Sequence, residues 1–174
     1  MLLGVALALV PCGVLALVLR RRMGWVNALA VAGFVWTLVV VGLVTLIPAQ
    51  GAPGVVPTEG RLSTCGELGG PAPAGFWIFA GGQRLLNTVL FVPSGILLVV
   101  VAARRLAWSP VVVPLGLALL AAYSAGIELV QLEVARIDRA CDLTDIVDNV
   151  SGAVVGVLLG VLVAVLLRPW RRSR

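Results

Sequence analysis

The chain has 174 residues, of which 60% are hydrophobic and only 12% are charged, and its mean hydropathy is +1.10. Soluble domains carry about 25% charged residues, so this composition excludes a soluble globular protein and predicts one that uses the lipid bilayer as solvent. The net charge of +5 does not indicate nucleic-acid binding, because the arginines flank apolar runs. Histidine is absent, which argues against a His-ligated metal, and the sequence indicates no metal and no cofactor.

Five apolar runs approach the length of about 20 residues that a helix needs to cross a bilayer. They lie at about 2–19, 25–47, 84–103, 110–132 and 143–167. The runs show no strand-like alternation, and a helix satisfies its own backbone polar groups in lipid. We therefore predict an all-α membrane protein, a bundle of about five transmembrane helices that forms a single membrane domain over 1–174.

The arginines predict the orientation of this bundle. The short segments at 20–22, 104–105 and 168–174 are basic and contain no acidic residue, whereas the connections at about 48–83 and 133–142 contain acidic residues. Cytoplasmic loops are the arginine-rich ones. We therefore predict the N-terminus outside, the C-terminus in the cytoplasm, and an outer loop at about 48–83 that is rich in Pro and Gly.

Two cysteines fall in the predicted outer connections. Cys65 lies in the outer loop and Cys141 lies just before the last apolar run. Disulfides persist outside the cytoplasm, so we predict a Cys65–Cys141 bond, with two free thiols as the alternative. Cys12 lies in the first apolar run, where a thiol behaves as a small apolar group.

Polar residues inside two of the runs are candidate site residues. An ionisable side chain within a span costs about 2.5–3.5 kcal/mol on insertion scales. Arg84 and Asn87 open the third run and share a helix face, since they are three apart. Ser124, Glu128 and Gln131 share a face near the outer end of the fourth run, where we expect Glu128 to be neutral or paired with a cation.

The start of the fifth run has the densest polar pattern. Its residues are Arg139, Asp142, Asp145, Asp148, Asn149, Gly152, Gly156 and Gly160. On a helix most of them form one stripe about 80° wide, with Asp148 at its edge. The outer half of the stripe has polar side chains and the inner half has only glycines. We expect the glycines to let another helix approach closely. Asp142 can be either a helix cap or a site residue. Arg139 can be either a site residue or the partner of Asp142 or Asp145 in an ion pair that fixes the loop.

The predicted orientation brings polar residues of three spans to a similar depth in the outer leaflet, where we expect one cluster. The candidate catalytic residues are Glu128 and Asp145. The candidate binding residues are Arg84, Asn87, Gln131, Arg139, Asp142, Asp148 and Asn149. Hydrogen bonding between helices is the alternative role for Asn87 and Gln131.

These stretches resemble the VanZ-like family of bacterial membrane proteins. The resemblance covers a core at about 83–160 and depends on Asn87-x-x-x-Phe91-x-Pro93-x-Gly95, Glu128-x-x-Gln131 and Arg139-x-x-Asp142-x-x-Asp145-x-x-x-Asn149-x-x-Gly152. It implies a multi-pass protein of the bacterial inner (cell) membrane that is associated with the cell envelope and with low-level resistance to the glycopeptide antibiotic teicoplanin. It implies no particular reaction.

Three functions therefore stay open. The first is an outer-leaflet site that binds or modifies an envelope component, such as a lipid-linked or peptidoglycan-related ligand. If the protein is an enzyme, Glu128 would be the general acid or base, and Arg84 or Arg139 would hold a phosphate or carboxylate of the ligand. The second is a small proton-coupled transporter. The lack of acidic residues in the cytoplasmic half of the predicted spans argues against it, because a proton path would need them. The third is a structural or assembly module. The sequence leaves catalysis and the oligomeric state open.

Overall fold

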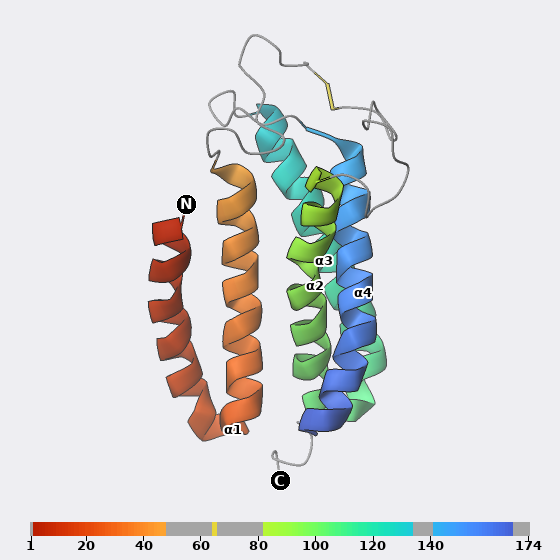
Figure 1. Cartoon of the computed structure of the whole chain (residues 1–174). Coiled ribbons are helices and arrows are strands. Elements are labelled where there is room, and N and C mark those ends of the chain that lie inside the picture. Colours follow the sequence, from red (N-terminus) through yellow and green to blue (C-terminus); the bar gives the residue numbers. More distant parts are fainter. Residues whose placement is uncertain (1, 48–63, 66–81, 134–140, 169–174) are drawn as a thin grey trace.

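The computed structural model describes residues 2–47, 64–65, 82–133 and 141–168, and this part of the chain is all-helical (Figure 1). The elements are α1 (Leu2–Leu46), α2 (Gly82–Ala102), the 3-10 helix η2 (Ala103–Trp108), α3 (Ser109–Glu133) and α4 (Leu143–Leu167). Three helical stretches are long and apolar enough to cross a membrane: Leu2–Leu46, Arg84–Glu133 and Leu143–Leu167. The predicted all-α class is thereby confirmed for the described residues, and the three stretches are consistent with the predicted membrane location.

The long helix α1 folds back on itself at Gly24. The backbone of Gly24 has φ 75° and ψ 167°, a conformation that a residue without a Cβ adopts most readily. The two arms of α1 lie side by side (Figure 1), and the indole N–H of Trp36 donates to the carbonyl of Val5 at 3.2 Å. The arginines at 20–22, expected in a connecting segment, instead continue the first arm, because one glycine is sufficient for the reversal.

The helices α2 and α4 run parallel in close backbone contact. The facing residues are Gly152 with Thr88, Gly156 with Val92 and Gly160 with Ile96. A Cβ on Gly152 would collide with the carbonyl oxygen of Thr88, and a Cβ on Gly156 with that of Val92. The close approach predicted from these glycines is therefore confirmed, and it follows the small-residue logic of helix pairs in membranes.

Polar bonds attach the second arm of α1 to α2 and α3. The Tyr123 hydroxyl donates to the carbonyl of Leu38 at 2.7 Å, and the Ser94 hydroxyl donates to Thr37 Oγ1 at 3.0 Å. Ser94 is fully buried, as is Phe91 in the apolar core beside it. Hydrogen bonds of this kind between membrane helices contribute on the order of 0.6 kcal/mol each. The remaining faces of the helices carry exposed leucine and valine side chains.

The tight α2–α4 interface predicts a position-specific response to a single methyl group. Gly156→Ala should lower the free energy of unfolding by about 1–3 kcal/mol, because the new Cβ has only backbone to displace. Gly126→Ala in α3 is the matched control, since a Cβ there has nothing within 4 Å. Thermal unfolding of both variants in detergent tests this; equal midpoints for the two would contradict the packing described.

Candidate functional site

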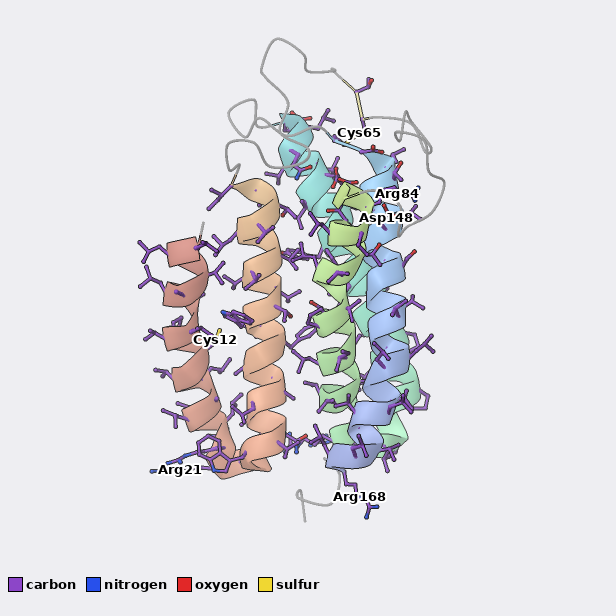
Figure 2. The ribbon with its side chains drawn as sticks, in the orientation of Figure 1. Cys12, Arg21, Cys65, Arg84, Asp148 and Arg168 are labelled. Atoms are coloured by element: carbon purple, nitrogen blue, oxygen red, sulfur yellow. A yellow bond between two sulfur atoms is a disulfide. The ribbon has the colours of Figure 1, made fainter. Side chains whose placement is uncertain are left out.

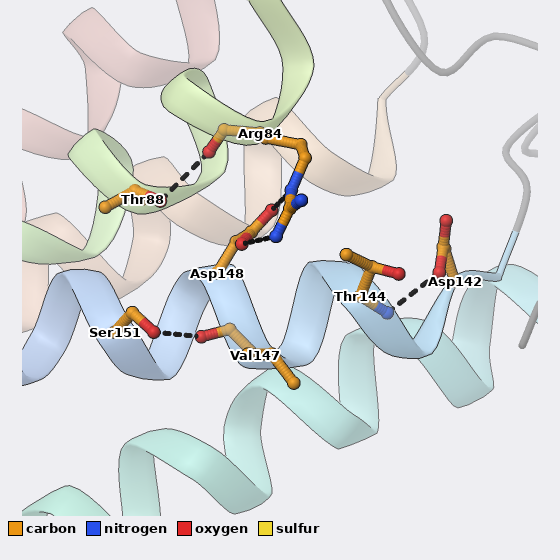
Figure 3. Close-up of polar contacts among 7 residues, drawn as sticks. All are labelled: Arg84, Thr88, Asp142, Thr144, Val147, Asp148 and Ser151. Atoms are coloured by element: carbon orange, nitrogen blue, oxygen red, sulfur yellow. Dashed lines mark hydrogen bonds and ion pairs between the residues drawn. The ribbon is translucent and has the colours of Figure 1, made fainter. Parts of the chain in front are cut away.

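A bidentate ion pair joins α2 to α4 at one end of the bundle. The guanidinium of Arg84 donates from Nε to Asp148 Oδ2 and from Nη2 to Asp148 Oδ1, both at 2.9 Å (Figure 3). The Asp148 side chain has no exposed surface, whereas that of Arg84 is 22% exposed. Because a buried carboxylate is tolerated only when it is paired, Asp148 requires Arg84. The pair uses two of the five guanidinium donors and leaves the others available.

The buried Glu128 of α3 stabilises the start of α4. Its side chain is 3% exposed, and its Oε2 accepts a hydrogen bond from the backbone N–H of Asp142 at 2.9 Å. Asp142 is the N-cap of α4, and its Oδ1 accepts from the N–H of Thr144 at 2.8 Å (Figure 3). Of the two roles left open for Asp142, the structure shows the helix cap, and the carboxylate of Glu128 fixes the backbone where the chain enters α4.

Three amide side chains complete this end of the bundle. Asn149 donates from Nδ2 to Ser124 Oγ at 2.9 Å, and Gln131 donates from Nε2 to the carbonyl of Thr45 at 3.0 Å. Within the described ranges, Asn149 Oδ1, Gln131 Oε1 and Asn87 Nδ2 are buried and form no hydrogen bond. An unsatisfied buried polar atom costs about 1–3 kcal/mol, so these three atoms distinguish the region from an ordinary helix interface.

The structure therefore brings predicted site residues from α2, α3 and α4 to the same end of the bundle. We call this group the polar cluster; its members are Arg84, Asn87, Ser124, Glu128, Gln131, Asp142, Asp148 and Asn149. Asp145 lies in the first turn of α4 and is half-buried. Arg139 lies outside the described residues. The roles of these residues in binding or catalysis remain proposals.

Sequence reasoning missed the main pairings in the cluster. The sequence pattern places Asp148 at the edge of the polar stripe and indicates no partner for it. A usable signal was present, because a carboxylate within a span needs a cation and Arg84 opens a predicted span at the same end. The bond between Ser124 and Asn149 had no comparable signal, since it depends on how two helices are rotated about their axes.

Two cysteines lie above the polar cluster. Cys65 and Cys141 have Cα atoms 4.6 Å apart, and their sulfur atoms are at bonding distance. This Cα separation is within the range of about 4.4–6.8 Å that disulfides show. Cys141 immediately precedes the N-cap Asp142, so the pairing would join the segment around Cys65 to the start of α4. Cys12 is buried in the first arm of α1 and is free.

The ion pair predicts a strongly asymmetric mutational response. Arg84→Gln should cost about 3–5 kcal/mol of unfolding free energy, because it leaves the Asp148 charge buried and unpaired. The double variant Arg84→Gln with Asp148→Asn should cost less than Arg84→Gln alone. Arg22→Gln, which alters an exposed arginine, should stay within about 0.5 kcal/mol of the parent. Equilibrium unfolding in mixed micelles measures all three, and a double variant that costs as much as Arg84→Gln alone, or more, would contradict the coupling.

Comparison with known proteins identifies the family. The model of the VanZ/LLP1 family matches residues 34–166, from the second arm of α1 to the end of α4. No curated protein and no solved structure matches the chain at a significant level. The match starts earlier than the stretch at about 83–160 that carries the sequence resemblance, and it contains every member of the polar cluster. Since it covers well over half of the sequence, this chain belongs to the VanZ/LLP1 family.

Proposed function

We propose that the polar cluster binds the polar head of a lipid-linked or peptidoglycan-related component in the outer leaflet of the bacterial inner membrane. The observation that carries this proposal is the set of three buried amide atoms without hydrogen bonds, at the same end of the bundle as a guanidinium with available donors. Through this ligand the protein would affect susceptibility to glycopeptide antibiotics of the teicoplanin type, as the family resemblance implies.

The available groups match the chemistry of such a head group. Arg84 is held in place by Asp148, and an arginine suits the planar or tetrahedral oxygens of carboxylate and phosphate. Asn87 Nδ2 is a further donor, while Asn149 Oδ1 and Gln131 Oε1 are acceptors for a ligand hydroxyl or amide. Because these side chains are already positioned by the protein, little rotamer freedom is lost on binding.

The carboxylates have a positioning role in this proposal. Glu128, a catalytic candidate from the sequence, has one oxygen bonded to the backbone N–H of Asp142, and both oxygens of Asp148 accept from Arg84. These contacts favour binding over general acid–base chemistry. A proton-coupled transporter, the second class left open by the sequence, has no specific contact in its favour among the described residues.

The proposed topology has five membrane crossings, with the N-terminus outside and the C-terminus in the cytoplasm. Each arm of α1 has 22 residues, Leu2–Met23 and Trp25–Leu46, which at 1.5 Å per residue matches a hydrocarbon core of about 30 Å. Arg21 and Arg168 lie at the end of the bundle opposite to Arg84 and Asp148 (Figure 2). The positive-inside rule places that basic end in the cytoplasm and the polar cluster outside.

The proposed binding role predicts a loss of function without loss of protein. Asn87→Ala should abolish the effect of the protein on teicoplanin susceptibility in complemented cells. It should also weaken retention of a lipid-linked peptidoglycan precursor about tenfold, because the ligand loses one hydrogen bond between Asn87 and a charged group. Membrane abundance should be unchanged, because Asn87 Nδ2 bonds to no other described residue. Ser151→Ala, which removes only a bond to the Val147 carbonyl in the same helix, is the control. Full activity of Asn87→Ala at normal abundance would overturn the proposal.

A structural or assembly module is the second candidate, because several members of the cluster bond to neighbouring helices. Glu128 with the Asp142 backbone, Asn149 with Ser124, and Gln131 with Thr45 are all of this kind. Under this alternative, variants of the cluster reduce the amount of folded protein and lose activity only in proportion. Quantifying folded protein and susceptibility for the same variants separates the two candidates.

The proposed topology also predicts the redox state of the cysteines. With Cys65 and Cys141 outside the cytoplasm, they should form a disulfide. Alkylation of the denatured, unreduced protein from cells should then modify only one of the three cysteines, Cys12. After reduction all three should react. Cys65→Ser should release the Cys141 thiol for labelling. Three reactive thiols without reduction would contradict both the bond and the outer location.

A further inference from the structure

The end of the bundle opposite to the polar cluster contains a cavity of about 420 Å³. It lies between the second arm of α1, just after the turn at Gly24, and the segment where α2 passes through η2 into α3. Asn27 and Val31 line it from α1, Arg104 and Arg105 from η2, and Val112 from α3. None of these residues belongs to the polar cluster, so this is a separate site.

Two consecutive arginines line this cavity because η2 interrupts the helical path. Arg105 has φ −124° and ψ 83°, outside the helical region, between the ends of α2 and α3. The Ser109 hydroxyl donates to the carbonyl of Ala102 at 3.0 Å and so braces the connection. In the described part of the chain the Nε of Arg104 is buried and has no hydrogen-bond acceptor. A buried guanidinium donor of this kind requires an anionic or carbonyl oxygen.

The rest of the lining is apolar. Val31 and Val112 line the cavity, as does Trp108, whose large exposed indole is typical of the membrane–water interface. Arg104 and Arg105 form its basic rim, while Arg21 and Arg168, at the same end of the bundle (Figure 2), lie outside the lining. The combination of a basic rim and an apolar wall at the membrane surface matches the two parts of a charged lipid.

We propose that this cavity binds an anionic glycerophospholipid in the leaflet opposite to the polar cluster. The phosphate accepts hydrogen bonds from Arg104 and Arg105, and an acyl chain lies along Val31 and Val112. An inorganic or soluble phosphate ester shares the head-group chemistry but gains nothing from the apolar wall. The lipid would fix the position of η2 against the second arm of α1.

The test uses the full-length protein in detergent and native mass spectrometry with added phosphatidylglycerol or phosphatidylcholine of the same acyl chains. The parent should retain phosphatidylglycerol in preference to phosphatidylcholine. Arg104→Gln with Arg105→Gln should retain it about 25-fold less, roughly fivefold for each basic residue removed. Arg22→Gln with Arg168→Gln makes the same change in charge outside the cavity lining and should stay within about twofold of the parent.

A second variant keeps both arginines and fills the cavity instead. Val112→Phe should weaken phosphatidylglycerol retention while the charge is unchanged, and it carries the test if the arginine variant does not fold. The site would be overturned if either cavity variant retained phosphatidylglycerol as well as the parent does. It would also be overturned if the control pair lost as much retention as the Arg104 and Arg105 variant. Displacement of the lipid by millimolar inorganic phosphate would overturn the lipid assignment, since a soluble anion would then be sufficient.

Discussion

The ion pair between Arg84 and Asp148 sets the register of α2 on α4, and the rest of the bundle depends on that register. Asp148 has no exposed surface, so sliding one helix by a turn would leave its charge buried without a cation. The glycine contacts have the same register: Arg84 and Asp148 are 64 residues apart, as are Thr88 and Gly152. The hydrophobic effect does not drive helices together in lipid, so the ion pair and the close backbone contact specify this interface.

The other helices are attached to this pair by fewer, polar contacts. Tyr123 and Gln131 of α3 both donate to carbonyls in the second arm of α1. The first arm is the most peripheral element of the bundle (Figure 1), and the bond from Trp36 to the Val5 carbonyl links it to the second arm. The family match begins at residue 34 and leaves this first arm out. The matched part of this chain thus comprises most of the second arm together with α2, α3 and α4.

The two ends of the bundle have different chemistry for one physical reason. At the end with the polar cluster, α4 begins, so carboxylates such as Asp142 and Asp145 are stabilised by the helix dipole and cap. Asp148 of the same helix pairs with Arg84, while Asn149 and Gln131 donate to Ser124 and to the Thr45 carbonyl, which gives a mixed set of donors and acceptors. At the opposite end the connections carry arginines alone. Among the described residues there, Arg104 Nε is buried without a hydrogen-bond acceptor, which suits an anion.

Much of the local structure could be predicted from the sequence. The helices start and end within a few residues of the predicted runs at 84–103, 110–132 and 143–167, because hydrophobicity along the chain specifies which residues can face lipid. The cap at Asp142 and the close approach at the glycines of α4 were also predictable, since both depend on residues within a few turns of each other.

Only the tertiary structure decided which polar groups meet. The pairing of Arg84 with Asp148, of Glu128 with the Asp142 backbone, and the fold-back of α1 at a single glycine were not predicted. Sequence periodicity specifies the face of a helix on which a residue lies, but not the rotation and register of that helix against its neighbours. Those are determined by the packing of all the helices together, which is why the helical class, the polar stripe and the gathering of polar residues at one end were predictable and the individual pairings were not.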